Sequence, residues 1–427
     1  MPQKRNGFVH VLVVLIIVIA IVFLTVSIFV SDKTKSQKND ERNLLNKITD
    51  TYPKCPANLE GILTFPMIDP KYISAITPLG NINPPGHTSP VDHNYFASNY
   101  SDKIPVFSPA DSWINSITVI MAKYDGEEEY KPLWYTLNHQ ICDGLVLTFA
   151  NYTELIQPLQ DIISKQKDEC KFGIKKDGHD FTEGQCYHRL DYKVKAGELI
   201  GWTEVEKEKG NALSFEIWAA NYNKPPKSGV NWDYYKDDRY AHIMCTFDLY
   251  TKNIKDEYSK KFGAWSIPKY KDSVTGKEML GSDGTFIPRM IEPLCGEVNQ
   301  DIVGTIQGMW FGGKPYKDQS IEFEGKGLAF LHNNIDPKMG EISVGGDLMG
   351  GRSRQIFFDP KFEGRVDIEP SQIKASGQVY CYNFFDDNEK PSKIIVQLVD
   401  DHNLKAEYKT GECNSDESFS SPYKYER

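Results

Sequence analysis

The residues best suited to do chemistry lie in one loop-like segment, residues 78–96, which reads PLGNINPPGHTSPVDHNYF. It places His87, Asp92 and His93 close together among glycine and proline. Imidazole and carboxylate groups are zinc ligands, and a rigid loop lowers the entropy lost when a metal binds. The segment therefore predicts a metal site at these three residues. The alternative is structural, because Asp92 and His93 could instead brace a turn.

Three of the seven histidines outside this segment also bear on the chemistry. His139 and His188 are close in sequence to Cys142 and Cys186, and a Cys–His pair is in principle nucleophilic. In an exported domain with eight cysteines, disulfide bonding is the favoured reading of these thiols. His332 precedes two asparagines and is read as a turn residue. His139 or His188 is kept only as a further ligand of a reassembled metal site.

Five short segments of the chain occur in an order that is seen in one protein family. They are the loop with His87 and Asp92, PVFSPADSWI at 105–114, DGLVLTFANYTEL at 143–155, KVKAGELIGW at 193–202 and GNALSFEI at 210–217. Together they resemble the motifs of lysostaphin-type zinc endopeptidases, which cut peptide cross-bridges in bacterial cell walls. The resemblance covers residues 78–218 and implies a peptidase-like β-sandwich of the duplicated hybrid motif type.

The zinc chemistry of that family is not carried over intact. Its closing motif supplies a catalytic histidine and a metal ligand where this chain has Ala212 and Ser214, and its other catalytic histidine falls on Asn151. Four residues separate His87 from Asp92, whereas the family has three. A zinc hydrolase needs about three protein ligands and a water. The resemblance therefore implies a retained fold without peptidase activity, so no cofactor is expected, with zinc as the alternative.

These residues must be positioned by β-structure, because the chain is rich in short β-branched and aromatic runs separated by Gly, Pro, Asn and Asp. In the first half, strands are predicted at 104–107, 113–122, 133–137, 145–149, 199–202 and 212–219. Apolar residues recur at helical spacing over 152–165, which predicts a helix there despite Pro158. A short polar helix is predicted within 247–263.

The C-terminal part is predicted to be an antiparallel β-barrel or sandwich. About eight strands with short connections are expected, at 304–311, 321–331, 341–345, 355–358, 364–368, 378–384, 393–398 and 404–408. The first of them contains Gly308-Met-Trp310 and resembles the Gly-x-Trp opening strand of lipocalin-like barrels. Trp310 is expected to plug one end of the barrel; a small apolar ligand inside is the alternative.

The N-terminus predicts a membrane anchor. Residues 8–30 carry no charged side chain, and twenty-odd apolar residues in a helix cross a hydrocarbon core of roughly 30 Å. A cleaved signal peptide is the alternative, but its apolar region is typically only about 7–15 residues and ends in a small-x-small site. The exit here, Ser27-Ile-Phe-Val30, is bulky. We therefore expect an uncleaved single-pass transmembrane helix.

The cysteines indicate on which side of the membrane the bulk of the chain lies. All eight follow the apolar run and none forms a Cys-x-x-Cys pair, so we expect disulfides in an oxidising, extracytoplasmic compartment. Asn99 and Asn151 begin Asn-x-Ser/Thr triplets and are candidate glycosylation sites. The net charge is −10 without a basic stripe, which argues against a nucleic-acid partner.

The expected chain is mainly β, with six parts. They are a cytoplasmic tail (1–7), the transmembrane helix (8–30), a charged stalk (31–54), the metallopeptidase-like β domain (55–220), a connector (221–290) and the C-terminal β domain (291–427). We expect a non-catalytic protein that binds or scaffolds at the cell envelope, with a glycan, peptide or protein as partner. Trp113, Trp202 and Trp218 are candidate stacking platforms. The alternative is a divergent zinc metallohydrolase that acts on cell-envelope peptides.

Overall fold

The computed structural model describes residues 52–84, 86–100, 102–166, 169–174, 181–206, 212–227, 230, 232–235, 238–264, 270–271, 278–279, 286–313, 326–386 and 388–427. Of these, Cys55–Arg427 belong to one compact unit. The predicted span at 8–30 and residues 31–51 of the predicted stalk lie outside the described residues. Within the described ranges, no helix is both long enough and apolar enough to cross a bilayer.

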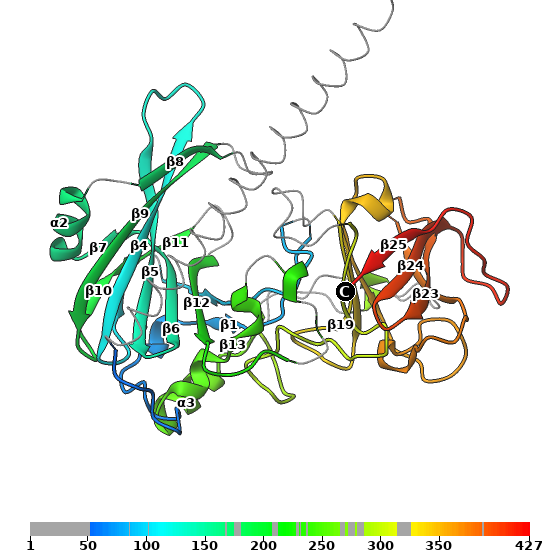
Figure 1. Cartoon of the computed structure of the whole chain (residues 1–427), viewed down its shortest axis with the longest axis horizontal. Coiled ribbons are helices and arrows are strands. Elements are labelled where there is room, and N and C mark those ends of the chain that lie inside the picture. Colours follow the sequence, from blue (N-terminus) through cyan, green and yellow to red (C-terminus); the bar gives the residue numbers. More distant parts are fainter. Residues whose placement is uncertain are drawn as a thin grey trace, which may run out of the picture. The chain divides into compact units, whose positions relative to one another are not determined.

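The first half of the unit is built on a large antiparallel sheet (Figure 1). Its strands follow the order β1-β2-β12-β6-β5-β4-β9-β8, with β11 and β13 paired to β12. Their bounds are β1 (Ala75–Thr77), β2 (Asn94–Ala97), β4 (Ser112–Tyr124), β5 (Lys131–Cys142), β6 (Leu145–Tyr152), β8 (Glu169–Ile174), β9 (Phe181–Val194), β11 (Val205–Glu206), β12 (Ala212–Asn221) and β13 (Ile243–Met244). The mainly β character and the strands predicted at 113–122, 133–137, 145–149 and 212–219 are confirmed.

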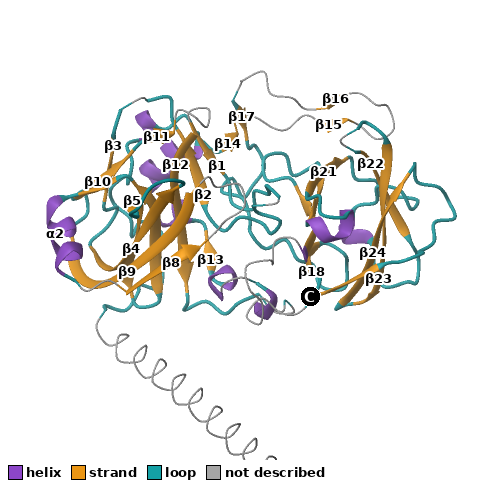
Figure 2. Ribbon diagram, turned by 90° about the horizontal axis from the view of Figure 1, so that it is seen from above, coloured by secondary structure: helices purple, strands orange, loops and turns teal. Residues whose placement is uncertain are grey.

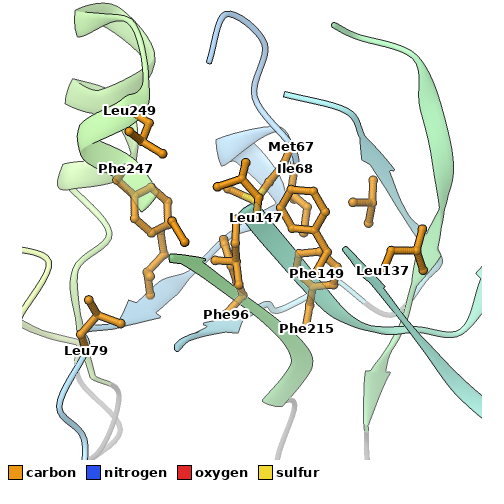
Figure 3. Close-up of a cluster of buried hydrophobic side chains, with 14 of the residues drawn as sticks. Met67, Ile68, Leu79, Phe96, Leu137, Leu147, Phe149, Phe215, Phe247 and Leu249 are labelled. Carbon is orange, nitrogen blue, oxygen red and sulfur yellow. The ribbon is translucent and has the colours of Figure 1, made fainter. Parts of the chain in front are cut away.

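A smaller sheet packs on one face of the large one. It contains β3 (Ile104–Phe107), β10 (Leu199–Thr203) and β7 (Glu154–Leu155) in the order β3-β10-β7. Alternate residues of a strand point to opposite faces, so Phe96, Phe149 and Phe215 enter the core between the layers (Figure 3). They are fully buried or nearly so. The next residues along these strands therefore point away from that core.

Two helices of the unit correspond to the predicted ones. α2 is Gln157–Lys165 and α3 is Lys252–Ser259. The prediction placed the first helix at 152–165, but Tyr152 ends β6 and residues 154–155 form β7. Pro158 lies in the first turn of α2, where its missing N–H costs nothing. The helix therefore begins at Gln157, next to the proline, and not at residue 152.

Short elements lie outside the large sheet and the barrel; η1 precedes the large sheet, and the others lie between β12 and the C-terminal strands in sequence. They are the 3-10 helices η1 (Pro70–Tyr72), η3 (Trp232–Tyr234), η4 (Asp238–Ala241) and η5 (Thr246–Leu249), and the strands β14 (Gly263–Ala264), β15 (Tyr270–Lys271), β16 (Glu278–Met279) and β17 (Ile287–Pro288). Phe247 and Leu249 of η5 belong to the same core as Phe96 and Phe215. The predicted boundaries at 220 and 290 stay predictions.

The C-terminal strands form a nearly closed eight-stranded antiparallel barrel, as predicted. The order is β21-β20-β19-β18-β25-β24-β23-β22, which is a simple meander in which the first strand pairs with the last (Figure 2). The bounds are β18 (Gly308–Phe311), β19 (Gly327–His332), β20 (Gly340–Val344), β21 (Arg354–Phe358), β22 (Tyr380–Phe385), β23 (Pro391–Asp400), β24 (Asn403–Thr410) and β25 (Tyr423–Glu426), with η8 (Gly346–Met349) and η9 (Pro370–Gln372) between strands.

Trp310 is fully buried in the barrel core, where its Nε1 donates to the Ile306 carbonyl at 2.8 Å. The Arg427 guanidinium lies over its ring, 4.2 Å from the centroid. The same guanidinium donates to the carbonyls of Gln307 and Thr305. These contacts join the first strand to the residue that follows the last one, and so hold the end of the barrel together. The predicted apolar ligand inside the barrel stays a prediction.

Two strand predictions differ from the structure for identifiable reasons. Residues 364–368 are not a strand, because Gly364 (φ +90°) and Asp367 (φ +54°) have left-handed backbone conformations that turn the chain. They nevertheless cover the edge of β22, since the Cys381 N–H donates to the Arg365 carbonyl. β25 was not predicted, because the sequence YKYE is short and has charged residues at two of its four positions.

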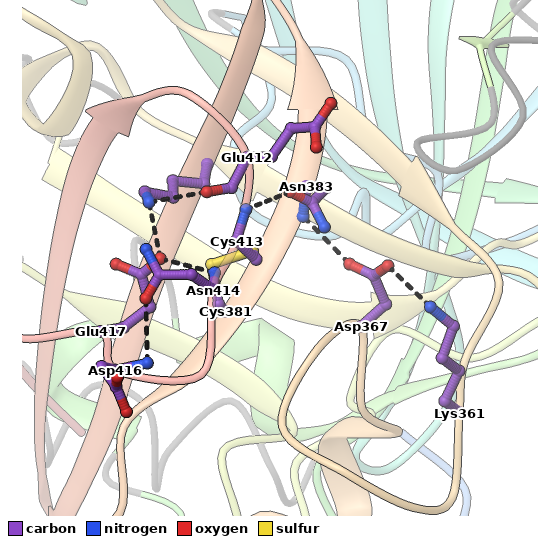
Figure 4. Close-up of a disulfide and its surroundings, with 10 residues drawn as sticks. Lys361, Asp367, Cys381, Asn383, Glu412, Cys413, Asn414, Asp416 and Glu417 are labelled. Carbon is purple, nitrogen blue, oxygen red and sulfur yellow. Dashed lines mark hydrogen bonds and ion pairs between the residues drawn. A yellow bond between two sulfur atoms is a disulfide. The ribbon is translucent and has the colours of Figure 1, made fainter.

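All eight cysteines form disulfides, which confirms the sequence prediction. The pairs are Cys55–Cys142, Cys170–Cys186, Cys245–Cys295 and Cys381–Cys413. Around the last pair, the Cys413 N–H donates to Asn383 Oδ1 at 2.8 Å, and a buried ion pair joins Lys393 to Glu417 (Figure 4). Four disulfides are typical of a domain that folds outside the cytoplasm.

The loop that carries His87, Asp92 and His93 is fastened to the barrel side of the unit. Asn334 Nδ2 donates to the Pro78 carbonyl at 3.1 Å, and the Leu79 N–H donates to the Cys295 carbonyl at 2.8 Å. Gln355 on β21 donates from Nε2 to the Ile82 carbonyl at 3.4 Å and also to the Glu341 carboxylate on β20. Glu341 is 1% exposed, and burial raises its pKa to about 7.

We expect Glu341→Gln to remove one contribution to the pH dependence of the free energy of unfolding. The folded chain binds a proton at Glu341 more tightly than the unfolded chain, so this carboxyl destabilises the fold increasingly as pH rises from about 4.5 to 7. The free energy of unfolding of the variant, minus that of wild type, should therefore rise by on the order of 3 kcal/mol across this window. Denaturant titrations at a series of pH values measure it.

Glu363→Gln is the control for this test, because Glu363 is an exposed carboxylate of the same C-terminal region. Its difference from wild type should not change between pH 4.5 and 8. A Glu341→Gln difference that is equally flat would show that burial of this carboxyl does not govern the pH dependence.

Candidate functional site

The candidate site lies on the face of the large sheet opposite the apolar core. On β12, Phe215 and Ile217 are fully buried in the core, so Glu216 and Trp218 point to the other face. On β2, Tyr95 is the direct cross-strand partner of Glu216. Figure 2 shows these two strands as neighbours. The sheet thus brings together side chains that are more than a hundred residues apart in sequence.

Asp92 and His93 lie just before β2 and form a buried carboxylate–imidazole pair. His93 Nδ1 is 2.8 Å from Asp92 Oδ1, and Arg239 Nη2 from η4 is 2.8 Å from Asp92 Oδ2. The Asp92 side chain is 4% exposed. Burial would favour the neutral acid, but the hydrogen bond from His93 and the Arg239 charge outweigh it and lower the pKa of Asp92. Asp92 is therefore a carboxylate with a partner at each oxygen.

The ionised Asp92 fixes the orientation of the His93 ring. Because the carboxylate can only accept, Nδ1 must donate to it, and Nε2 points towards Glu216. Nε2 lies 3.5 Å from Glu216 Oε2 and has no hydrogen-bond partner among the described residues. Burial, opposed by His93 and reinforced by Asp92, raises the pKa of the Glu216 carboxyl. Its side chain is still 21% exposed, so solvent reaches it.

Aromatic rings enclose His93 on two sides. Its ring centroid is 4.6 Å from that of Tyr95 and 5.5 Å from that of Trp218. The Arg239 guanidinium lies over the Trp218 ring at 4.6 Å, and the Tyr95 hydroxyl is 3.1 Å from His87 Nε2. Burial, together with the Glu216 and Asp92 charges, raises the pKa of Tyr95. The Tyr95 hydroxyl therefore keeps its proton.

The predicted site residues are brought together only in part. Asp92 and His93 are in direct contact, and His87 reaches the cluster through Tyr95. Asn151, which has φ +67°, hydrogen-bonds to Glu216 through its side chain, so this candidate glycosylation site belongs to the cluster. Ala212 and Ser214 lie in β12, before Glu216.

His139 and His188 lie on the other face of the sheet and do not join the site. His139 is fully buried, its Nδ1 is 3.2 Å from Ser112 Oγ, and its ring packs on Phe149 at 4.7 Å. Burial lowers the pKa of His139 to about 3, so it is neutral. His188 is buried opposite Ile117 of β4. The neighbouring cysteines are disulfide-bonded, which removes a Cys–His nucleophile.

His332 and the three candidate tryptophans lie on four different strands. His332 ends β19, and its Nε2 is 3.2 Å from Glu369 Oε1, an ion pair that raises its pKa. Trp113 lies on β4 with Lys193 Nζ 5.7 Å from its ring centroid, whereas Trp202 lies on β10 of the small sheet. Trp218 is 8% exposed and packs against Arg239. The three rings do not form one platform.

Three members of the cluster were not predicted from the sequence. Glu216 stands in GNALSFEI, and Tyr95 in the segment at 78–96, so both lay within segments already singled out. Each is flanked along its strand by buried residues. This alternation would have indicated that Glu216 and Tyr95 face away from the core, on the side of the predicted loop. Arg239 lies in a polar stretch, KDDRY, with no pattern of its own. Only the tertiary fold brings it to Asp92.

The cluster does not fit a zinc site. Each Asp92 oxygen already has a cationic or N–H partner, and no group of three His, Cys, Asp or Glu side chains in the described part of the chain could hold a metal ion. What the arrangement offers is a buried carboxylate–imidazole–carboxylate row, Asp92, His93 and Glu216, next to aromatic rings.

We expect Arg239→Met to lower the free energy of unfolding by about 3–5 kcal/mol, because it leaves the buried Asp92 carboxylate without its cation. Lys195→Met is the matched control. It breaks a pair with Asp111 of similar length, 2.7 Å, but both side chains are mostly exposed to water, so the free energy of unfolding should hardly change.

Denaturant unfolding of both variants measures the two costs. Adding Asp92→Asn to Arg239→Met should recover part of the loss, because the uncompensated charge is then gone. Equal, small effects of Arg239→Met and Lys195→Met would show that Asp92 does not depend on Arg239.

Comparison of the chain with protein-family models, with curated proteins and with solved structures found no match. What the cluster does must therefore be argued from its own chemistry. Its fixed elements are the Asp92–Arg239 ion pair, the contact of His93 Nδ1 with Asp92, and the partly exposed Glu216.

Proposed function

We propose that the chain is a membrane-anchored, extracytoplasmic binding protein. Residues 8–30 would hold it in the membrane, and the cluster around Asp92, His93 and Glu216 would recognise a ligand without catalysing a reaction. The partner would be a component of the cell envelope, namely a glycan, peptide or protein. The likeness to lysostaphin-type domains would then concern the scaffold and not the chemistry.

The location is supported by two independent features. The apolar run at 8–30 has the length and composition of a transmembrane helix. The four disulfides after it require an oxidising compartment to form and persist. A single-pass anchor whose short N-terminal tail lies in the cytoplasm would place the disulfides on the oxidising side of the membrane.

One observation supports a non-catalytic role: each oxygen of the Asp92 carboxylate is already in contact with another side chain. To bind zinc, an Asp92 oxygen would have to leave either Arg239 or His93, and both contacts are short and buried. Leaving Arg239 would separate a buried ion pair, which is strongly unfavourable. The chain also lacks histidine at 151, 212 and 214, where the family resemblance would require it.

The divergent zinc hydrolase is the second candidate, and one distance favours it. His93 Nε2 and Glu216 Oε2 are 3.5 Å apart, a separation that two ligands of one tetrahedral metal also have when each is about 2.0–2.2 Å from it. His87 would have to leave Tyr95 to serve as a third ligand.

Metal analysis distinguishes the two candidates. We expect the full chain, purified in detergent and dialysed against a weak chelator, to hold far less than one zinc per chain, and to leave cell-wall peptides uncleaved. Added zinc should not raise its melting temperature. The reason is coordination number, since Asp92 is engaged and too few ligands remain.

His87→Ala is the variant that makes this result decisive. About one zinc per wild-type chain, lost in His87→Ala, would contradict the binding-protein proposal and establish the metallohydrolase. Equal and negligible zinc in both would leave His87 as a partner of Tyr95.

A separate test addresses the anchor. After carbonate extraction of cells that express the full chain, we expect the protein to stay in the membrane pellet, because residues 8–30 lie in the hydrocarbon core. Val18→Arg, at the centre of the run, should weaken this retention, since a central Arg costs about 2.5–3.5 kcal/mol on insertion scales. Release of the wild-type chain into the aqueous fraction would refute the anchor.

A further inference from the structure

The large sheet ends in an edge strand whose residues are exposed. β8 is the last strand in the order of the sheet, and among the described strands it pairs only with β9, beside which it lies in Figure 1. Its exposed residues include Glu169, Lys171, Phe172 and Gly173. The outer side of an edge strand presents backbone N–H and C=O groups, with which another extended chain can pair.

A disulfide holds this edge strand in position. Cys170 of β8 and Cys186 of β9 are direct cross-strand partners, and they are bonded to each other. Cys186 belongs to the buried core of the unit, so the bond ties the edge to the folded part of the sheet. A strand that is already fixed in an extended conformation loses less conformational entropy when a second chain pairs with it. β8 is therefore preformed for pairing.

Two pairs of aromatic rings lie at this end of the sheet. Phe172 of β8 packs on Tyr130 with the ring centroids 4.7 Å apart, and the Tyr130 hydroxyl accepts from the Gly173 N–H at 3.1 Å. Tyr124, at the end of β4, packs on its cross-strand partner Phe181 at 5.4 Å. Phe172 is nevertheless 53% exposed and Tyr124 is 41% exposed. The rings are held in place and still offer apolar surface to the solvent.

Packing within the sheet accounts for only part of the Phe172 side chain. Its ring covers Gly184 of β9, where an added Cβ would lie 2.5 Å from Phe172 Cδ1. An aromatic ring over a glycine stabilises the strands beneath it, and this explains the covered face of the ring. The exposed face stays in water, and burying it against a partner would be favourable.

The loop that joins Tyr124 to Tyr130 is acidic. Residues 125–129 read DGEEE. Lys131 pairs with Glu127, whereas the other three carboxylates of the loop are exposed and form no ion pair among the described residues. Residues 175–180, which follow β8 and lie outside the described part, have two lysines and two aspartates and so add no net charge of their own. The rings are therefore accompanied by a surplus of negative charge.

This charge decides between the possible occupants of the edge. A second copy of the chain carries the same acidic loop and a net charge of −10, so its approach is electrostatically disfavoured. The anionic headgroups of a membrane are repelled for the same reason. A cationic chain is attracted. Because alternate residues of a strand point to opposite faces, the surface fits an extended segment in which basic and apolar residues alternate.

We propose that the edge of β8, the rings of Phe172 and Tyr124 and the acidic loop 125–129 form a docking surface for a basic, extended segment of a partner protein. The segment adds a strand to β8, with its cationic side chains near the loop and its apolar ones on the rings. In the strand order, β8 and β2 lie towards opposite ends of the large sheet, so this surface is separate from the cluster around Asp92 and Glu216.

The test uses synthetic peptides and the full chain in nanodiscs of phosphatidylcholine, with empty nanodiscs as the blank. The probe is an octapeptide of alternating lysine and valine with blocked termini. One counterpart has glutamate in place of lysine, and the other has serine in place of valine. We expect the lysine–valine peptide to bind about tenfold more tightly than either counterpart, and added salt to weaken its binding.

Hydrogen exchange locates the bound peptide. The amides of β8 (Glu169–Ile174) should exchange more slowly when the lysine–valine peptide is present, because their outward N–H groups then donate to it. The amides of β22 (Tyr380–Phe385), the last strand in the order of the barrel, should exchange at the same rate with and without the peptide.

Neutralising the acidic loop tests the role of charge. The loop variant combines Asp125→Asn, Glu128→Gln and Glu129→Gln, and should bind the probe about tenfold more weakly than wild type. Its matched control changes the net charge equally at exposed carboxylates of the C-terminal region. The control variant combines Asp359→Asn, Glu363→Gln and Glu412→Gln. It should bind as wild type does.

Removing the exposed ring tests the apolar contact. Phe172→Ser should weaken binding of the lysine–valine peptide and bring it close to that of the lysine–serine peptide. Phe362→Ser is the matched control, because Phe362 is also an exposed ring, 73% exposed, but lies after β21 in the C-terminal region. Melting temperatures show that both variants are folded at the temperature of the titration.

Several results would overturn the proposal. They are equal binding of the lysine and glutamate peptides, equal losses in the loop variant and its control, and unchanged exchange at β8. Self-association of wild type that Phe172→Ser abolishes would assign the surface to a second copy. Slower exchange at β8 in peptide-free nanodiscs than in detergent would assign it to lipid. None of these results depends on the zinc content, so they are distinguishable from a failure of the proposed function.

Discussion

The Asp92 carboxylate is the interaction on which the candidate site depends. It is buried, and it holds Arg239 at one oxygen and His93 at the other, each at 2.8 Å. It therefore joins the loop before β2 to η4, which lies almost 150 residues further along the chain, and it orients the His93 imidazole. Removing Arg239 would leave a charge in a place where water cannot solvate it. The approach of His93 Nε2 to Glu216 follows from this arrangement.

The barrel contributes to the site although none of its residues lies in the cluster. The loop that ends at Asp92 runs along the barrel side of the unit, where Asn334 and Gln355 hold the carbonyls of Pro78 and Ile82. The approach is close enough to need glycine, because a Cβ on Gly80 would lie 2.1 Å from the Glu297 carbonyl oxygen. β18 and β19 are buried on both faces, with Trp310 in the barrel core and Phe311 in the core shared with the large sheet. A change in the barrel wall is therefore expected to reach His93 through the backbone of this loop.

The sequence was informative where local pattern determines structure and uninformative where distant segments meet. The strand at 104–107, the core strands of the large sheet and the meander of the barrel follow from runs of apolar and β-branched residues. β9 was not predicted, because its sequence, FTEGQCYHRLDYKV, has the polar residues Glu183 and His188 at buried positions, where the alternation calls for apolar ones. Asp92 and His93 could be singled out from residue type and spacing. Arg239 could not, since its only role in the site is a long-range ion pair that no local pattern encodes.

The same ion pair explains why a metal ion at His93 and Asp92 would be unfavourable. A metal at His93 and Asp92 would require the carboxylate to turn away from Arg239, whose guanidinium would then keep only its contact with the Trp218 ring. That separation costs several kcal/mol. Structural zinc sites offset such costs with about 10–16 kcal/mol of binding, but only when all their ligands are in place. Among the described residues, no group of three His, Cys, Asp or Glu side chains is placed to supply that gain, so the Asp92–Arg239 pair stays the favoured arrangement.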